Sequence, residues 1–282
     1  MAEQLVQIGD LRPDSGSSRR GSHRLGSWNE CPQAWAYRFM LHLIPVREPP
    51  GRALGALVHL GLMYWHLLML QRTDLDPIEV MRSASPRIAH RFNDARAIVE
   101  AYKNWGWPAG WKVLDVEREF EVRAGGHAHT QRMDLVIAVD GYACVVDHKT
   151  TGGNPHTYPR EWNTSLQFLS ADTIGRAVFP DVYDLPYGGT WIQAIGTKEP
   201  GEFHRHRLSP EPEMLRSAPS SIAEANEEIA RVVQSGRDPW AYKRTYKCRG
   251  RYTCDYIALC ERGKSALGEY VEAEDQEAEI ER

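Results

Sequence analysis

Two acidic residues and a lysine near the middle of the chain are residue types suited to phosphate chemistry. Asp134 precedes the apolar run 135–139, while Asp147 and Lys149 follow the apolar run 142–146. Residues two apart on a strand share a face, so Asp147 and Lys149 are expected to point the same way. Two carboxylates can hold a divalent cation, and a nearby lysine can neutralise developing negative charge. The trio indicates phosphodiester hydrolysis; the alternative is a surface ion pair at a strand end.

The elements that position these groups are two predicted strands, 130–139 and 142–149, joined by Asp140-Gly141. Asp-Gly supplies the positive φ angles of a tight turn, so the pair is predicted to be an antiparallel hairpin. This pairing brings Asp134 to the edge of the sheet where the second strand ends.

The other predicted elements place this hairpin in an α/β core behind a helical region. Helices are predicted at 27–42, 52–71, 77–105 (with a possible break at Ser85-Pro86), 162–177 and 210–234, and strands at 113–122, 187–195 and 202–208. The predicted organisation is a flexible basic arm (1–26), one domain (27–265) and an acidic tail (266–282). Within the domain, 27–110 is helical, 111–209 is the catalytic core and 210–265 is a helix with a cysteine segment.

Composition limits the functional classes. The 282 residues carry a net charge of −4, with 42% apolar and 26% charged residues, as in an ordinary globular protein. No apolar run approaches the ~20 residues of a membrane span, and the N-terminus lacks a signal-peptide core. We therefore expect a cytoplasmic protein without membrane contact, from a bacterium or a phage in a bacterial host.

Nucleic-acid binding by a chain of this charge requires local basic patches. One candidate is the run of cations with interleaved tyrosines near the cysteines: Tyr242, Lys243, Arg244, Tyr246, Lys247, Arg249, Arg251 and Tyr252. Cations with aromatics suit single-stranded nucleic acid, although a solvated loop is an equal alternative. The second and weaker candidate is His204-Arg205-His206-Arg207.

Three of the five cysteines lie close together near the C-terminus. Cys248, Cys254 and Cys260 are each separated by five residues, and Cys31 is a possible fourth member. Cys144 lies within an apolar strand and is expected to be a small buried residue. Without a secretory signal, disulfides are disfavoured. Free thiols, a zinc site and an iron–sulfur centre remain open.

Several motifs, taken in order, resemble the PD-(D/E)XK nuclease superfamily, and more closely its RecB-like branch. Ser27 to Pro32 resembles the opening helix of that branch, and Gly55 to His59 resembles its G-x-x-x-H helix. Arg132-Met133-Asp134, Asp147-His148-Lys149 and the later Gln167 resemble the catalytic series. The late cysteines with Cys31 resemble the four-cysteine iron–sulfur clamp of helicase-associated and CRISPR-associated members. The resemblance extends over residues 27–260.

The resemblance implies a restriction-endonuclease-like fold and a set of site residues. Catalytic roles fall on Asp134, Asp147, Lys149 and Gln167. Asp134, Asp147 and the main-chain carbonyl of His148 offer the oxygen ligands that Mg²⁺ or Mn²⁺ prefers. His59 is implied as a further ligand, and an imidazole favours Mn²⁺. Glu119 is a candidate ligand ahead of Glu117, the alternative being a solvated strand residue.

The cysteines Cys31, Cys248, Cys254 and Cys260 are implied to hold a [4Fe–4S] cluster, with zinc as the alternative. The implied activity is a metal-dependent deoxyribonuclease, specifically an exonuclease acting on ends or single strands of DNA in DNA processing, repair or recombination. A helicase or recombination partner, or a homo-oligomer, fits the resemblance. The alternatives are a catalytically silent DNA-binding or adaptor subunit and a structural zinc protein.

Overall fold

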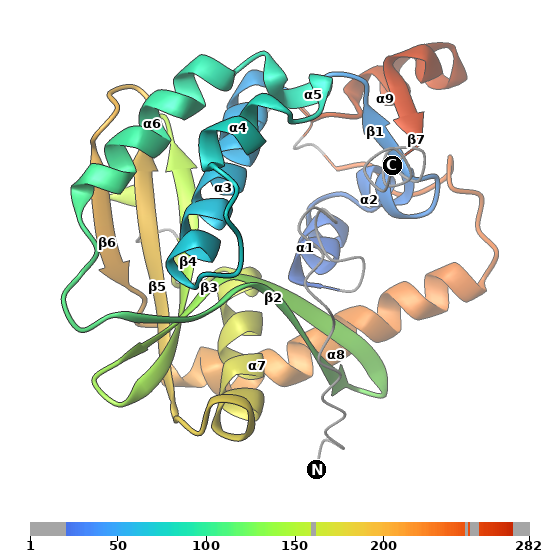
Figure 1. Cartoon of the computed structure of the whole chain (residues 1–282). Coiled ribbons are helices and arrows are strands. Elements are labelled where there is room, and N and C mark those ends of the chain that lie inside the picture. Colours follow the sequence, from blue (N-terminus) through green and yellow to red (C-terminus); the bar gives the residue numbers. More distant parts are fainter. Residues whose placement is uncertain (1–20, 159–161, 246–247, 249–253, 273–282) are drawn as a thin grey trace.

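A five-stranded mixed sheet forms the centre of the fold (Figure 1). The computed structural model describes residues 21–158, 162–245, 248 and 254–272. The strands lie in the order β2–β3–β4–β5–β6; only the β4–β5 pair is parallel. Their bounds are β2 Lys112–Ala124, β3 His127–Val139, β4 Tyr142–Thr151, β5 Tyr187–Gly196 and β6 Phe203–Arg207. The predicted α/β architecture is confirmed.

The hairpin between β3 and β4 forms as its turn sequence predicts. Asp140 and Gly141 have φ angles of 50° and 80°, and Val139 pairs with Tyr142 across the turn. Leu135 therefore lies opposite Val146. This register sets Asp134 beside the end of β4 that carries Asp147 to Lys149.

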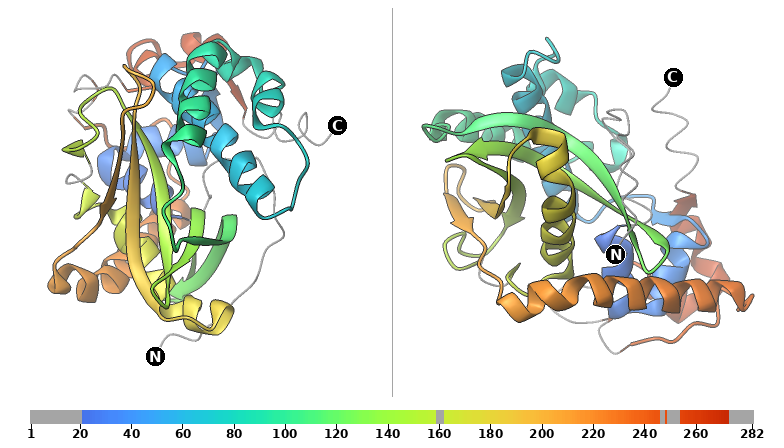
Figure 2. Two further views of the ribbon diagram at one scale, coloured as in Figure 1. Left: turned by 60° about the vertical axis from the view of Figure 1, so that its left-hand side comes forward. Right: turned by 90° about the horizontal axis from the view of Figure 1, so that it is seen from below.

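Two long helices cover opposite faces of the sheet (Figures 1 and 2). On one face, Met63 and Leu67 of α3 (Pro50–Met69) pack against the face carrying Leu135 and Val146. On the other, α7 (Leu166–Tyr183) packs against the strand residues that point away from α3, including Val145. The alternation of a strand thus divides β4 into an α3 side and an α7 side.

The remaining helices extend these two layers. α4 (Pro77–Arg82), α5 (Pro86–Ala89) and α6 (Phe92–Trp105) pack on α3. α1 (Ser22–Glu30), α2 (Pro32–Phe39) and α8 (Pro212–Gln234) form a second group around Trp28 and Ile222, with α8 packed against α7 (Figure 2). The C-terminal segment contains α9 (Ile257–Arg262), the 3₁₀ helix η3 (Gly263–Glu269) and β7 (Tyr270–Glu272), which pairs with β1 (Leu43–Pro45).

Proline interrupts two of the predicted helices. The helix expected at 27–42 is two helices, because Pro32 starts a new helix after the extended residue Cys31. The helix expected at 77–105 breaks at Ser85-Pro86, the predicted break point, and breaks again before Phe92. Pro77 and Pro86 each occupy the first turn of a new helix, behind the capping side chains of Asp76 and Ser85.

Some element bounds differ from the ranges expected from the sequence. α1 begins at Ser22, inside the segment expected to be a flexible arm, and the acidic tail expected from 266 includes part of η3 and all of β7. The helix expected at 162–177 runs instead from Leu166 to Tyr183. Residues 1–20 and 273–282 lie outside the described residues. Within the described part of the chain, no helix combines the length and apolar character needed to cross a membrane.

Candidate active site

On the α3 side of β4, Asp134 is held by two histidines. Its Oδ2 atom accepts a hydrogen bond from the His148 main-chain N–H at 2.8 Å. The same oxygen lies 3.3 Å from Nδ1 of His59, which comes from α3. It also lies 3.6 Å from Nδ1 of His148. The hairpin and α3 therefore fix the direction of this carboxylate from separate parts of the chain.

An irregularity in the β2–β3 pair brings Glu117 into the same site. Val116 and Leu135, which pair with each other, pack on the α3 side, whereas Phe120 and Met133 pack on the α7 side. A regular strand would keep Val116 and Phe120 on one face. Glu117 lies where the alternation changes and has a left-handed φ of 49°. This conformation costs a non-glycine residue about 1–3 kcal/mol and is concentrated at functional sites.

His59, Glu117 and Asp134 form a group that could hold a metal ion. Each offers one ligand atom, and these three atoms lie within 4.8 Å of one another. One imidazole with two carboxylates suits a divalent transition metal such as Mn²⁺, and the oxygens also suit Mg²⁺.

The α7 side of β4 carries the other predicted catalytic groups. Asp147 Oδ1 lies 2.5 Å from Lys149 Nζ, and Asp147 Oδ2 accepts a hydrogen bond from Gln167 Nε2 at 2.9 Å. Lys149 Nζ lies 5.5 Å from the ring centre of Trp162 and 5.4 Å from that of Phe168. The ammonium group therefore combines an ion pair with two aromatic contacts.

Burial and nearby charges shift the pKa values of Asp134 and Asp147 in opposite directions. Burial raises the pKa of Asp147 to about 6; the charge of Asp134 also raises it, while Lys149 opposes the shift. Burial also acts to raise the pKa of Asp134, but His59, the bond from His148 and Lys149 together hold that pKa well below its usual range. For Lys149, the two aspartates outweigh burial and raise the pKa. Near neutral pH, the site thus holds a charged lysine that interacts with both carboxylates.

The matching family model identifies the chain. The model of the PD-(D/E)XK nuclease superfamily matches residues 23–261, which include every group described above. The chain belongs to the PD-(D/E)XK nuclease superfamily. The five-stranded mixed sheet flanked by helices agrees with the restriction-endonuclease-like fold of this superfamily.

One solved structure has a similar overall fold. A presumed exonuclease from Eubacterium rectale superposes with a TM-score of 0.56 at 11% identity, covering 87% of this chain and 94% of its own. The structure of SSO0001 covers 81% of this chain and 94% of its own at 11% identity, with a TM-score of 0.33. Curated protein sequences gave no match.

The structure gathers the predicted PD-(D/E)XK residues at one end of β3 and β4. Asp134, His148 and His59 meet on the α3 side, and Asp147, Lys149 and Gln167 meet on the α7 side. Glu119 lies outside the candidate metal group and pairs with Arg132 at 3.7 Å. Glu117, which the sequence ranked below Glu119, lies in the candidate metal group where Glu119 was expected.

The structure adds aromatic groups that sequence reasoning missed. Trp162 and Phe168 contact Lys149, and their rings meet edge to face with centres 5.5 Å apart. Phe168 directly follows Gln167 at the start of α7. The aromatic surface beside Lys149 therefore comes from α7 and from the segment that precedes it.

The four cysteines of the predicted cluster come from the α1–α2 junction and the C-terminal segment. Cys31 precedes α2, and the Cys254 N–H donates to the Cys248 carbonyl at 3.1 Å. Burial raises the pKa of the Cys254 thiol to about 11, and the nearby Cys31 and Cys248 thiols add to that shift. Cys260, on α9, packs in the same apolar cluster as Cys254. The strand residue Cys144 is buried elsewhere, as predicted.

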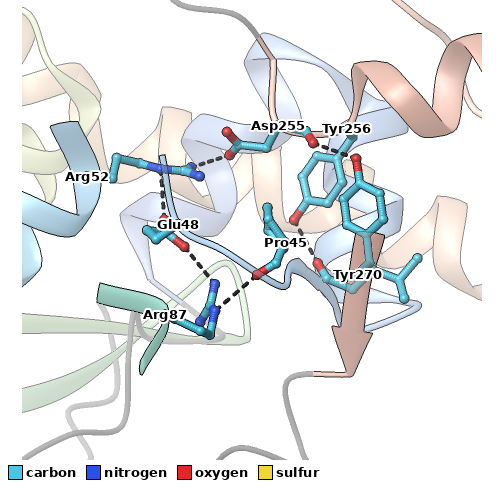
Figure 3. Close-up of polar contacts among 8 residues, drawn as sticks. Pro45, Glu48, Arg52, Arg87, Asp255, Tyr256 and Tyr270 are labelled. Carbon is cyan, nitrogen blue, oxygen red and sulfur yellow. Dashed lines mark hydrogen bonds and ion pairs between the residues drawn. The ribbon is translucent and has the colours of Figure 1, made fainter. Parts of the chain in front are cut away.

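A polar clamp fastens the cysteine segment to the start of α3 (Figure 3). Arg52 of α3 pairs with Asp255 and, at 2.8 Å, with Glu48. Glu48 also pairs with Arg87 of the α5 helix at 2.6 Å. The Tyr256 hydroxyl donates to the Leu43 carbonyl at 2.8 Å. The clamp therefore joins the segment after Cys254 to the helix that carries His59.

The structure describes only some members of the two predicted basic patches. Tyr242 is 4% exposed and packs against Trp28 and Trp35, so it cannot stack on a base. Arg205 donates to the Gly106 carbonyl at 2.7 Å. Five members of the first patch lie outside the described residues: Tyr246, Lys247, Arg249, Arg251 and Tyr252.

Proposed function

We propose that this protein is a metal-dependent deoxyribonuclease that hydrolyses phosphodiester bonds at ends or single-stranded parts of linear DNA. The observation that carries the proposal is that Asp134, which is grouped with His59 and Glu117, is hydrogen-bonded to His148, the residue between the paired Asp147 and Lys149. Superfamily membership supports hydrolysis of a phosphodiester. The preference for ends draws on the described exonuclease with a similar fold and on the RecB-like resemblance.

The residues present fit a divalent cation. His59, Glu117 and Asp134 offer a nitrogen and two oxygens, and Asp147 with the main-chain carbonyl of His148 completes the proposed ligand set. A bound divalent cation would acidify a water molecule and offset phosphate charge. The imidazole favours Mn²⁺ over Mg²⁺.

The chain's own groups then have distinct tasks. Lys149 is proposed to stabilise the negative charge that develops on the phosphate, because its ammonium group is charged and only 18% exposed. Gln167 orients Asp147 through a 2.9 Å hydrogen bond. Trp162 and Phe168 line one side of the ammonium group and can limit the access of water to it.

For the cysteine region, we propose a [4Fe–4S] cluster held by Cys31, Cys248, Cys254 and Cys260. The electrostatic influence of Cys31 and Cys248 on the Cys254 thiol supports their proximity. Zinc is the alternative occupant of the same four cysteines. The iron and zinc content of anaerobically purified protein separates the two.

The test is cleavage of end-labelled linear DNA by anaerobically purified protein with Mg²⁺, Mn²⁺ or EDTA, beside Lys149→Ala. The expected result is metal-dependent degradation that falls about 10³-fold in a folded Lys149→Ala variant. A closed circular substrate separates cutting at ends from internal cutting.

Other results would favour the alternatives. Intact DNA in both metals, with folded protein that still binds DNA, would contradict the nuclease and support a silent binding subunit. Folded protein that neither cleaves nor binds DNA, with one zinc per chain and no iron, would support a structural zinc protein.

A further inference from the structure

A buried polar chain runs behind the candidate metal group, through the ring of His148. His148 is 2% exposed, Tyr102 of α6 is 4% exposed and Gln193 of β5 is fully buried. Their side chains are connected: His148 Nε2 lies 3.3 Å from the Tyr102 hydroxyl, which in turn donates to Gln193 Oε1. Three elements thus converge on the residue between Asp147 and Lys149.

The Tyr102 hydroxyl joins the other two members of this polar chain. It donates its proton to Gln193 Oε1 and lies 3.3 Å from His148 Nε2. This contact leaves the opposite ring nitrogen, Nδ1, 3.6 Å from Asp134 Oδ2.

Aromatic packing restrains the same ring. His66 of α3 stacks on His148 with ring centres 5.5 Å apart and an angle of 27° between the planes. His59 meets His148 edge to face at 6.1 Å, and Tyr102 does so at 5.8 Å. The imidazole is therefore enclosed by α3 and α6, and its rotation would disturb each of these contacts.

The position of His148 matters because its main chain belongs to the site. Its N–H holds Asp134 Oδ2 at 2.8 Å, and its carbonyl belongs to the ligand set proposed above. We propose that Tyr102 and Gln193 are positioning residues, which hold the His148 ring and thereby set the orientation of Asp134 and of the β4 main chain for cation binding. The inference rests on the metal site of the proposed function, not on cleavage.

Removing a residue that orients a metal ligand without contacting the metal commonly weakens metal affinity 10- to 100-fold. If the hydrogen bonds of Tyr102 and Gln193 are purely structural, losing them lowers the stability of the protein without changing the affinity of the folded protein for the cation. Cation binding to the folded protein therefore separates the two roles.

The experiment measures Mn²⁺ binding to the full chain by calorimetry, without DNA, for wild type and Tyr102→Phe. We expect Tyr102→Phe to raise the dissociation constant about 10-fold or more. The matched control is Tyr187→Phe, which also removes a hydroxyl, in this case one bonded to Thr190 at 2.9 Å. This control should bind Mn²⁺ like the wild type, because Tyr187 packs in the α7 cluster.

A second variant tests whether Gln193 acts through Tyr102. Gln193→Leu alone should weaken Mn²⁺ binding, whereas adding it to Tyr102→Phe should produce little further loss. If Tyr102→Phe does not fold, Gln193→Leu alone gives the same comparison.

A dissociation constant within twofold of wild type for folded Tyr102→Phe, or for Gln193→Leu in its place, would overturn the inference. So would a wild-type protein that binds no Mn²⁺. Wild-type protein that binds Mn²⁺ but leaves DNA intact would contradict the nuclease proposal alone.

Discussion

The candidate active site and the cysteine region both gather side chains from distant parts of the sequence, but different structures hold them. In the active site, Asp134, Asp147 and Lys149 belong to one hairpin whose register is fixed by main-chain pairing. In the cysteine region, Cys31 and the C-terminal cysteines are connected through short elements and the polar clamp between Arg52 and Asp255. The first region has a continuous framework, whereas the second depends mainly on side-chain contacts.

This difference predicts opposite responses to mutation. Removing a catalytic side chain leaves the hairpin paired, so chemistry should be lost before stability. Removing a cysteine takes away a connection between the α1–α2 junction and the C-terminal segment. Where a metal centre supplies that connection, its binding energy contributes directly to folding. The cysteine region should therefore control stability.

The largest expected effect on stability comes from Cys254→Ser. Loss of one ligand should release the inorganic centre and lower the free energy of unfolding by about 3 kcal/mol or more, since structural metal sites contribute on the order of 10 kcal/mol. Iron and zinc content, measured with the thermal unfolding midpoint, checks this. Cys144→Ser is the control and should retain the metal. Unchanged stability and metal content in Cys254→Ser would contradict the view that the cysteine region controls stability while the active site controls chemistry.

A paired substitution tests the assignment within the active site. Glu117→Gln removes a charge from the candidate metal group and should raise the Mn²⁺ dissociation constant about 10- to 100-fold. Glu119→Gln, two residues away and paired with Arg132, should change it less than threefold. Calorimetric titration of both variants gives the comparison. Equal losses would show that the left-handed conformation at Glu117 does not select the ligand.

The pH dependence of Mn²⁺ binding should follow Asp147. Burial raises the pKa of this carboxyl to about 6, and a protonated carboxyl cannot ligate a cation. Affinity should therefore be constant above that value and fall about tenfold per pH unit below it. Burial lowers the pKa of His59, which moves protonation of this imidazole to lower pH than in a free histidine. Titration of wild type from about pH 5 to 8 should show the decline, and Asp147→Asn should abolish it.

The smallest effect on stability is expected from breaking the polar clamp between Arg52 and Asp255. Arg52 is 43% exposed, so loss of its two ion pairs in Arg52→Met should cost about 1 kcal/mol or less. Arg96→Met removes one exposed pair with Glu100 and should cost less than the loss in Arg52→Met. Chemical unfolding can compare the two. A loss of several kcal/mol in Arg52→Met would mean that the clamp, rather than the cysteines, carries the stability of this region.

Local signals in the sequence were sufficient for the centre of the site. Asp140-Gly141 predicted the turn, and the turn fixes the register that brings Asp134 to the end of β4. The position of Gln167 near the start of a helix was also predicted, and it contacts Asp147. These features succeed because turn chemistry and strand alternation act over a few residues.

Features that depend on contacts between elements were not predictable in the same way. Regular alternation places Glu117 and Glu119 on the same face of a strand and so cannot choose between them, whereas the left-handed φ at Glu117 interrupts that alternation. Nothing in the residues around Tyr102 or Gln193 indicates that both meet His148, because they are 46 and 45 positions away and on different elements.

The sequence by itself determined the order of the elements, the β3–β4 hairpin and the residue types available for phosphate chemistry, because each is encoded by neighbouring residues. Tertiary structure decided which glutamate joins His59 and Asp134, which aromatic rings contact Lys149, and how the His148 ring is held. Those outcomes depend on how α3, α6 and α7 pack on the two faces of one sheet, and packing between distant segments leaves no local pattern in the chain.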